Sequence, residues 1–171
     1  KSTNKKHPAK YSDSFIPIFA DVLKNTNNVL DPMAGTGKIS LIQDYGYSGN
    51  IYCHDILDWG ELKHEDVKWK FGDASSLDYE TNFFDAICTS PVYGNRMSDH
   101  FNSKDGSKRL TYRHGFGSEL SKENTGRMQW GGRYREKHTD IYKDCKRVLK
   151  ESGLFVINTS DHIRKGEVVP V

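Results

Sequence analysis

The stretch NVLDPMAGTGKISLIQDYG, from Asn28 to Gly46, decides the fold. It opens with a short apolar run up to Asp31, crosses a turn of small residues, and continues with helix-forming residues up to Tyr45. A buried strand, a tight turn and a helix form the first half of a βαβ unit, which builds parallel sheets. We predict a strand that ends at Asp31 and a helix from about Gly37 to Tyr45, stopped by Gly46.

The same alternation continues along the chain. Three more strands are predicted to end at Asp55, near Asp73 and at Ser90, and LFVINTSD, residues 154–161, is a fifth. Helices are predicted within 12–25, at 59–64 and from 133 to Gly153, which closes the last one. The apolar residues at helical spacing in the first helix, behind Ser12 or Asp13 as N-cap, are Phe15, Ile18, Phe19, Val22 and Leu23. Apolar strand centres between helices indicate an α/β fold with a parallel sheet covered on both faces.

Length and composition set further bounds. The 171 residues suffice for one domain with a sizeable core, and the net charge of +2 says little about partners. The three cysteines, Cys53, Cys88 and Cys145, lack metal-binding spacing, which favours a reducing, cytoplasmic setting. The chain has no apolar run of about 18 residues and no signal-peptide core near its start, so we expect a soluble protein without a membrane partner.

The predicted strand ends carry polar residues. In open α/β sheets, ligands bind beyond the carboxyl ends of the strands. The first four strands end at or near Asp31, Asp55, Asp73 and Ser90, where that rule expects a ligand.

The turn DPMAGTGK, residues 31–38, fits neither common nucleotide motif. A phosphate-binding P-loop needs glycine at position 32 and Ser or Thr at position 39, where this chain has Pro32 and Ile39. The dinucleotide pattern G-x-G-x-x-G fails at its third glycine, because position 40 is Ser40.

The small residues of this turn still suit a ligand. Ala34, Gly35 and Gly37 let a ligand approach the backbone at a helix N-terminus. Asp55 follows Gly35 at the interval from which a carboxylate accepts hydrogen bonds from ribose, and Asp31 suits a cationic amine. The turn therefore favours a nucleoside over a polyphosphate. The alternative is a turn with capping aspartates only.

A family resemblance rests on three blocks. VLDPMAGTGK, residues 29–38, resembles the first S-adenosylmethionine-binding motif of the amino-methylating DNA methyltransferases, usually written D-P-F-x-G-x-G. TSPVYGN, residues 89–95, resembles their catalytic S-P-P-Y or N-P-P-Y motif, and HPAKYS, residues 7–12, is similar to the segment before their first helix. These blocks and the strands between them cover about the first 95 residues, and residues 133–161 fit the same fold.

The resemblance implies a Rossmann-like class I methyltransferase domain over residues 1–171, with 94–132 as an insertion over the active site. In that family a helix and an antiparallel strand pair normally follow the fifth strand. Because this chain stops at Val171, we expect these C-terminal strands to be missing. It also implies S-adenosylmethionine as cofactor, no metal, and DNA methylation of the restriction-modification kind in the cytoplasm of a bacterial, archaeal or phage-infected cell. The implied cofactor-binding residues are His7, Pro8, Lys10, Tyr11, Asp31, Pro32, Ala34, Gly35, Gly37, Asp55, Ile56, Asp73, Ala74 and Ser90.

The resemblance makes residues 90–93 the catalytic stretch. An exocyclic amine is a poor nucleophile, and hydrogen-bond acceptors that draw its hydrogens favour a pyramidal nitrogen. Ser90 Oγ and the Pro91 carbonyl are suitable acceptors, and Tyr93 can stack on a base that has left its helix. Val92 replaces the second proline of the motif, which leaves reduced or lost activity open.

The segment 94–132 indicates a nucleic-acid partner. It carries seven Lys or Arg against four Asp or Glu, interleaved with aromatic residues that suit phosphate contacts and base stacking. The predicted substrate-binding residues are Asn95, Arg96, Arg109 and Arg113. We expect DNA as the partner, with Ser90 leaning toward cytosine N4 over adenine N6. A solvated lid, an RNA substrate and a catalytically silent binding module remain alternatives, and the oligomeric state is open.

Overall fold

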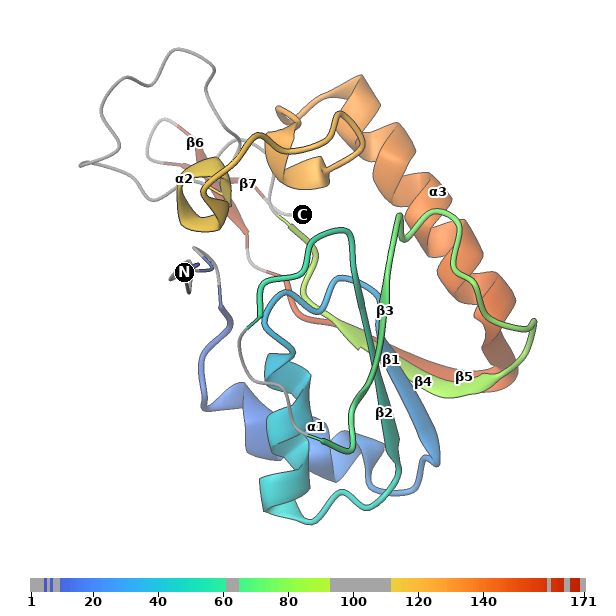
Figure 1. Ribbon diagram of the computed structural model, residues 1–171. Coiled ribbons are helices and arrows are strands. Elements are labelled where there is room, and N and C mark those ends of the chain that lie inside the picture. Colours follow the sequence, from blue (N-terminus) through green and yellow to red (C-terminus); the bar gives the residue numbers. More distant parts are fainter. Residues whose placement is uncertain are drawn as a thin grey trace.

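A five-stranded parallel sheet forms the centre of the molecule (Figure 1). The computed structural model describes residues 5, 7, 10–60, 65–92, 112–159, 161–164 and 167–169. The sheet has the strand order β3-β2-β1-β4-β5. Its strands are β1 (Asn28–Asp31), β2 (Asn50–Asp55), β3 (Lys68–Phe71), β4 (Phe84–Thr89) and β5 (Leu149–Ile157). All four pairings are parallel, which confirms the predicted α/β class.

Helices lie on both faces of this sheet (Figure 1). The helix α1 (Phe15–Leu23) and the 3₁₀ helix η1 (Lys38–Tyr45) lie together on one face, and α3 (Gly132–Val148) lies on the other. The remaining elements are α2 (Tyr112–Phe116), the 3₁₀ turn η2 (Thr125–Arg127), β6 (His162–Arg164) and β7 (Glu167–Val169). The strands β6 and β7 pair antiparallel as a separate two-stranded sheet.

Neighbouring residues of β1 show why both faces need a cover. Successive side chains of a strand point to opposite faces. Val29 belongs to the core cluster of α1 and η1, whereas Leu30 belongs to the cluster of α3, and neither side chain is exposed. Strands buried on both faces are apolar throughout, as expected for parallel sheets.

The structure corrects the predicted end of the last helix. The helix α3 ends at Val148 and β5 begins at the next residue, so Gly153 lies inside a strand and closes no helix. A Cβ atom at Gly153 would come within 2.6 Å of Leu149 Cδ1 and 3.0 Å of the Asp85 carbonyl oxygen. The glycine therefore permits close backbone packing beside a register shift between Phe84 and Ala86.

The apolar residues at helical spacing in α1 are not all buried. Phe19 and Leu23 are buried, but Phe15, Ile18 and Val22 are exposed to 37%, 54% and 44%. The helix packs against the sheet and η1 on one side only, so its apolar residues exceed what that side covers. The buried residues of α1 are Ile16, Phe19, Ala20 and Leu23.

Two further predictions about helices need correction. Ser14 occupies the N-cap of α1 without a side-chain cap bond, while the Ser12 hydroxyl accepts a hydrogen bond from the Ser14 amide. Trp59 and Gly60 are not helical, and the rest of the helix predicted at 59–64 lies outside the described residues.

The cysteines and the helices bear on the expected setting. Cys53, Cys88 and Cys145 are all buried and free. Across the described ranges, no helix is both long and apolar enough to cross a membrane.

Candidate active site

One cavity of about 260 Å³ lies at the carboxyl ends of the five parallel strands. Each strand contributes a polar lining residue at its end or within two residues of it. These residues are Asp31, Asp55, Asp73, Ser90 and Asn158. The first four were predicted from the sequence, whereas Asn158 was not.

Most of the predicted site residues line this cavity. They are His7, Lys10, Tyr11, Asp31, Pro32, Ala34, Gly35, Asp55, Ile56, Asp73, Ala74, Ser90, Pro91 and Val92. Gly37 lies outside the lining, at the start of η1, and its amide donates to the Ala34 carbonyl at 2.8 Å. Arg113 is exposed on α2 and does not line the cavity. The predicted residues that fall outside the described part of the chain are Pro8, Tyr93, Asn95, Arg96 and Arg109.

Asp31 lies buried at the end of β1, with 2% of its surface exposed. Its Oδ1 accepts hydrogen bonds from Thr89 Oγ1 at 2.8 Å and from the Met33 amide at 3.1 Å. Burial raises the pKa of Asp31 to about 7, although both hydrogen bonds act to lower it, and the nearby Asp55 carboxylate adds to the rise. A cationic ligand group beside Asp31 would favour its charged form.

Asp55 connects the end of β2 to the turn after β1. Its two oxygens accept hydrogen bonds from the Gly35 amide at 2.8 Å and the Leu57 amide at 2.9 Å. Burial raises the pKa of Asp55 to about 6, while these bonds and one from the Trp59 side chain lower it. The Asp55 carboxylate thus holds the turn in place through the Gly35 amide, in addition to its predicted role as a ligand acceptor.

The turn itself needs glycine at position 35. Gly35 has φ +57°, and a Cβ atom there would come within 2.8 Å of His7 Nε2. The His7 ring also packs edge-on against Trp59, with ring centroids 4.5 Å apart. The approach of His7 to the bare backbone of Gly35 forms one wall of the cavity.

Tyr11 brings an unsatisfied polar atom to the cavity wall. Its hydroxyl is buried and has no hydrogen-bond partner among the described residues. Burial raises the pKa of Tyr11, so the group stays a neutral hydroxyl, and its ring packs against Phe19. Buried polar groups almost always find a partner, so a ligand is the natural partner for this hydroxyl.

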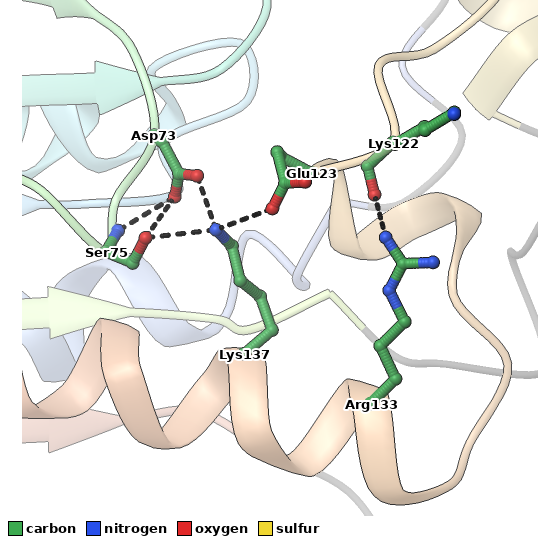
Figure 2. Close-up of polar contacts among 6 residues, drawn as sticks. All are labelled: Asp73, Ser75, Lys122, Glu123, Arg133 and Lys137. Carbon is green, nitrogen blue, oxygen red and sulfur yellow. Dashed lines mark hydrogen bonds and ion pairs between the residues drawn. The ribbon is translucent and has the colours of Figure 1, made fainter.

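A lysine from α3 links two carboxylates at the cavity (Figure 2). Lys137 Nζ donates to Asp73 Oδ2, to Ser75 Oγ at 3.0 Å and to Glu123 Oε2 at 3.2 Å. Partial burial acts to raise the pKa of Asp73, but the bonds from Lys137 and Ser75 outweigh it and lower that pKa. Arg133 also donates to the Lys122 carbonyl at 3.1 Å, so α3 holds the segment around Lys122 and Glu123 at two points.

The segment held by α3 forms part of the cavity wall. The lining residues that the sequence reasoning missed include Trp59, Tyr112, Glu123, Asn124, Thr125 and Asn158. Lys137 was missed as well, although its place between Tyr134 and His138 on the apolar side of a predicted helix was a usable signal. Four of the missed lining residues belong to the part of the 94–132 segment that the structure describes.

Beyond the end of β4, two hydrogen-bond acceptors have no partner among the described residues. The Thr89 carbonyl accepts from the Asn158 amide at 2.9 Å, and the Val92 carbonyl accepts from the Tyr134 hydroxyl. Between them, Ser90 Oγ and the Pro91 carbonyl have no hydrogen bond to any described residue. The Val92 side chain packs in an aromatic cluster with Trp59, Tyr112, Leu120, Leu57 and Phe116.

No three His, Cys, Asp or Glu side chains within the described ranges are grouped so that they could hold a metal ion. The acidic strand ends are held instead by amides, hydroxyls and Lys137.

Comparison with solved structures identifies the fold. No protein-family model and no curated protein matches the chain. The PH0226 protein from Pyrococcus horikoshii is 20% identical, with a TM-score of 0.52 over 87% of this chain and 53% of that one. The YcgJ protein from Bacillus subtilis is 16% identical, with a TM-score of 0.52 over 85% of this chain and 50% of that one. A protein described as a type II methyltransferase, from Anaeromyxobacter dehalogenans, is 13% identical, with a TM-score of 0.51 over 88% and 48%.

The fold is therefore the Rossmann-like fold seen in class I methyltransferases. The chain spans about half the length of these neighbours.

Proposed function

We propose that the chain binds S-adenosylmethionine in this cavity and transfers its methyl group to an exocyclic amine of a DNA base, cytosine N4 or adenine N6. The observation that carries the proposal is that Asp31 and Asp55 line the same cavity as the Ser90 and Pro91 acceptors. A methyl donor held by the two carboxylates and an amine held by the two acceptors would lie side by side.

The cavity residues fit the cofactor chemically. Asp31 and Asp55 are buried carboxylates whose pKa values are raised by burial, and among the described residues neither has a cationic partner. S-adenosylmethionine carries an ammonium and a sulfonium, and its ribose presents hydroxyls to acceptors. The Tyr11 hydroxyl and the bare backbone at Gly35 offer a donor and a close approach.

The acceptors after β4 suit the amine. When bound, the cofactor supplies an electrophilic methyl group. Ser90 Oγ and the Pro91 carbonyl accept the two hydrogens of the amine, so its lone pair turns toward the methyl carbon. The amine nitrogen would form a bond to the methyl carbon as the carbon–sulfur bond of the sulfonium breaks, which would leave a neutral thioether and release one amine proton to water. The chain's contribution is position and orientation.

The choice of DNA rests on the basic and aromatic residues of the 94–132 segment. Arg113 on α2 is exposed, which suits a phosphate contact. The Ser90 hydroxyl favours cytosine N4 by resemblance, and RNA is the alternative acceptor that the assay includes.

The test is transfer of labelled methyl groups to unmethylated DNA and to RNA, together with calorimetry of S-adenosylmethionine binding. Ser90→Ala should leave the cofactor Kd within about twofold and lower turnover on DNA by about 100-fold, because one of two acceptors is lost. Ser48→Ala, an exposed serine before β2, is the matched control and should change neither quantity. Cofactor binding without transfer to either nucleic acid would overturn the proposal.

A further inference from the structure

The hydroxyl of Tyr134, on α3, bonds to the chain segment that follows β4. Tyr134 lies in the first turns of α3, is 5% exposed, and donates its hydroxyl hydrogen to the Val92 carbonyl. Its ring lies between those of Trp130 and His138, with centroids 5.1 and 4.0 Å away. These neighbours restrict the ring, so the hydroxyl has a defined position.

The helix that carries Tyr134 is itself fixed to the sheet. Arg147, near its C-terminal end, donates to the Leu77 carbonyl at 2.8 Å and to the Tyr79 carbonyl at 2.9 Å. Ile141, Cys145 and Val148 of the same helix are buried in the core. The Tyr134 hydroxyl is therefore anchored to the same framework as the strand ends.

Thr89 anchors the other side of the same short segment. Its side chain donates to Asp31 Oδ1 at 2.8 Å, and its carbonyl accepts from the Asn158 amide at 2.9 Å. The two residues between these anchors, Ser90 and Pro91, carry the acceptors that no described residue satisfies. Two free acceptors thus lie between two bonded residues.

We propose that Tyr134 is a positioning residue for methyl transfer. Its hydroxyl fixes the Val92 carbonyl, and this sets the direction of Ser90 Oγ and the Pro91 carbonyl. The inference rests on the proposed function, and it assigns a part in the reaction to Tyr134, which does not line the cavity. A misplacement of about 1 Å at a reacting group can cost on the order of 100-fold in rate, so a single distant hydroxyl can matter.

The main-chain freedom at Val92 explains why this hydrogen bond is needed. Valine leaves φ free to vary, whereas proline fixes φ near −65°. The Val92 amide donates no hydrogen bond to any described residue, so its replacement by proline breaks none there. A proline at this position would restrain the same peptide segment by another physical means.

The first test is the Tyr134→Phe variant. We expect the carbonyl carbon resonance of Val92 to shift and the amide order parameters of Ser90 and Val92 to fall in nuclear magnetic resonance spectra. The cofactor Kd and the KM for DNA should stay within about threefold, while kcat falls by about 10- to 100-fold. Tyr79→Phe is the matched control, because the Tyr79 hydroxyl is buried and has no hydrogen-bond partner among the described residues.

The second test is a rescue. The double variant Tyr134→Phe, Val92→Pro should have a kcat at least tenfold higher than that of Tyr134→Phe. A loss of packing alone would not allow this recovery. An unchanged kcat in Tyr134→Phe, or a kcat loss that the second substitution leaves in place, would overturn the positioning role.

A wild-type protein that binds S-adenosylmethionine but methylates neither DNA nor RNA would overturn the proposed function instead. The order parameters of Ser90 and Val92 then decide the positioning role by themselves: a fall in Tyr134→Phe supports it, and unchanged values refute it.

Discussion

Thr89 Oγ1 donates a 2.8 Å hydrogen bond to Asp31 Oδ1, and this bond joins the carboxyl ends of the central strand β1 and its neighbour β4. Among the described residues, the carboxylate receives only uncharged donors, the Thr89 hydroxyl and the Met33 amide. Burial therefore dominates, and the pKa of Asp31 rises to about 7. The protein holds a carboxylate at a strand end that is poised between its neutral and charged forms near neutral pH.

Asp31→Asn should change how stability depends on pH. The pKa of Asp31 is about 7 in the folded chain and about 3.9 in an unfolded one. Between these values the folded chain keeps a proton that the unfolded chain has released, so the free energy of unfolding of the wild type falls as pH rises. From pH 5 to pH 8 the variant should gain about 3 kcal/mol relative to the wild type in urea unfolding.

Two buried histidines act in the opposite direction in both proteins. Burial lowers the pKa of His54 and of His138, so each contributes stability that is lost as pH falls through the unfolded value near 6.5. Their effect cancels in the difference between wild type and variant. A difference that stays constant from pH 5 to pH 8 would show that Asp31 has an ordinary pKa.

Asp55→Ala should weaken cofactor binding and the fold together. The substitution removes the predicted ribose acceptor and leaves the Gly35 and Leu57 amides without their partner. We expect the Kd for S-adenosylmethionine to rise by about 10- to 100-fold and the free energy of unfolding to fall by about 2 kcal/mol. Calorimetry and urea unfolding measure the two effects. Asp58→Ala, which loses a comparable bond to the Gly60 amide at an exposed site, should leave the Kd unchanged.

Gly35→Ala should disturb the turn by two separate effects. A side chain at φ +57° is strained, and its Cβ atom meets the His7 ring at 2.8 Å. Gly60→Ala carries only the first effect, since Gly60 has φ +70° but open space around it. Gly60→Ala should lose about 1 to 2 kcal/mol of stability and Gly35→Ala more than that, and only Gly35→Ala should also raise the cofactor Kd, by about tenfold. Equal Kd values for the two variants would argue against a role of the His7 wall in binding.

Lys137→Met should release the segment around Glu123 from the cavity. The lysine side chain is 12% exposed and donates to Asp73, Ser75 and Glu123. Its loss leaves Asp73 without a cationic partner among the described residues, and we expect about 1 to 3 kcal/mol less stability in urea unfolding. Lys143→Met on the same helix breaks an exposed pair with Asp140 at 3.6 Å and should cost less than about 0.5 kcal/mol. Similar losses in both variants would mean that Lys137 contributes only as a surface charge.

Local sequence spacing predicted the parts of the site that lie within one βα unit. Asp31, Gly35 and Asp55 follow from a strand, a turn and the next strand, whose geometry depends on neighbours in sequence. Lys137 and Tyr134 reach the site from α3, so their contacts depend on how a distant helix docks on the sheet.

The same reasoning explains two errors in the fold. The pattern of α1 showed which residues are apolar, but the depth to which sheet and η1 cover the helix left Ile18 exposed. Gly153 follows an apolar helical pattern, where a glycine commonly ends a helix. It lies inside β5 instead, because the space beside Leu149 and Asp85 leaves no room for a Cβ atom. In both cases a tertiary contact overrode a local signal.

The order of strands in the sheet has a consequence for how the protein is made. During synthesis β1, β2 and β3 emerge first and can pair in turn, whereas β4 must close the loop of residues 32–83 to reach β1. The ligand cavity draws on both halves, from Asp31 and Asp55 in the first to Ser90 and Asn158 in the second. A ligand bound in this cavity would therefore stabilise only the completed sheet, and we expect it to slow hydrogen exchange in β4 and β5 most strongly.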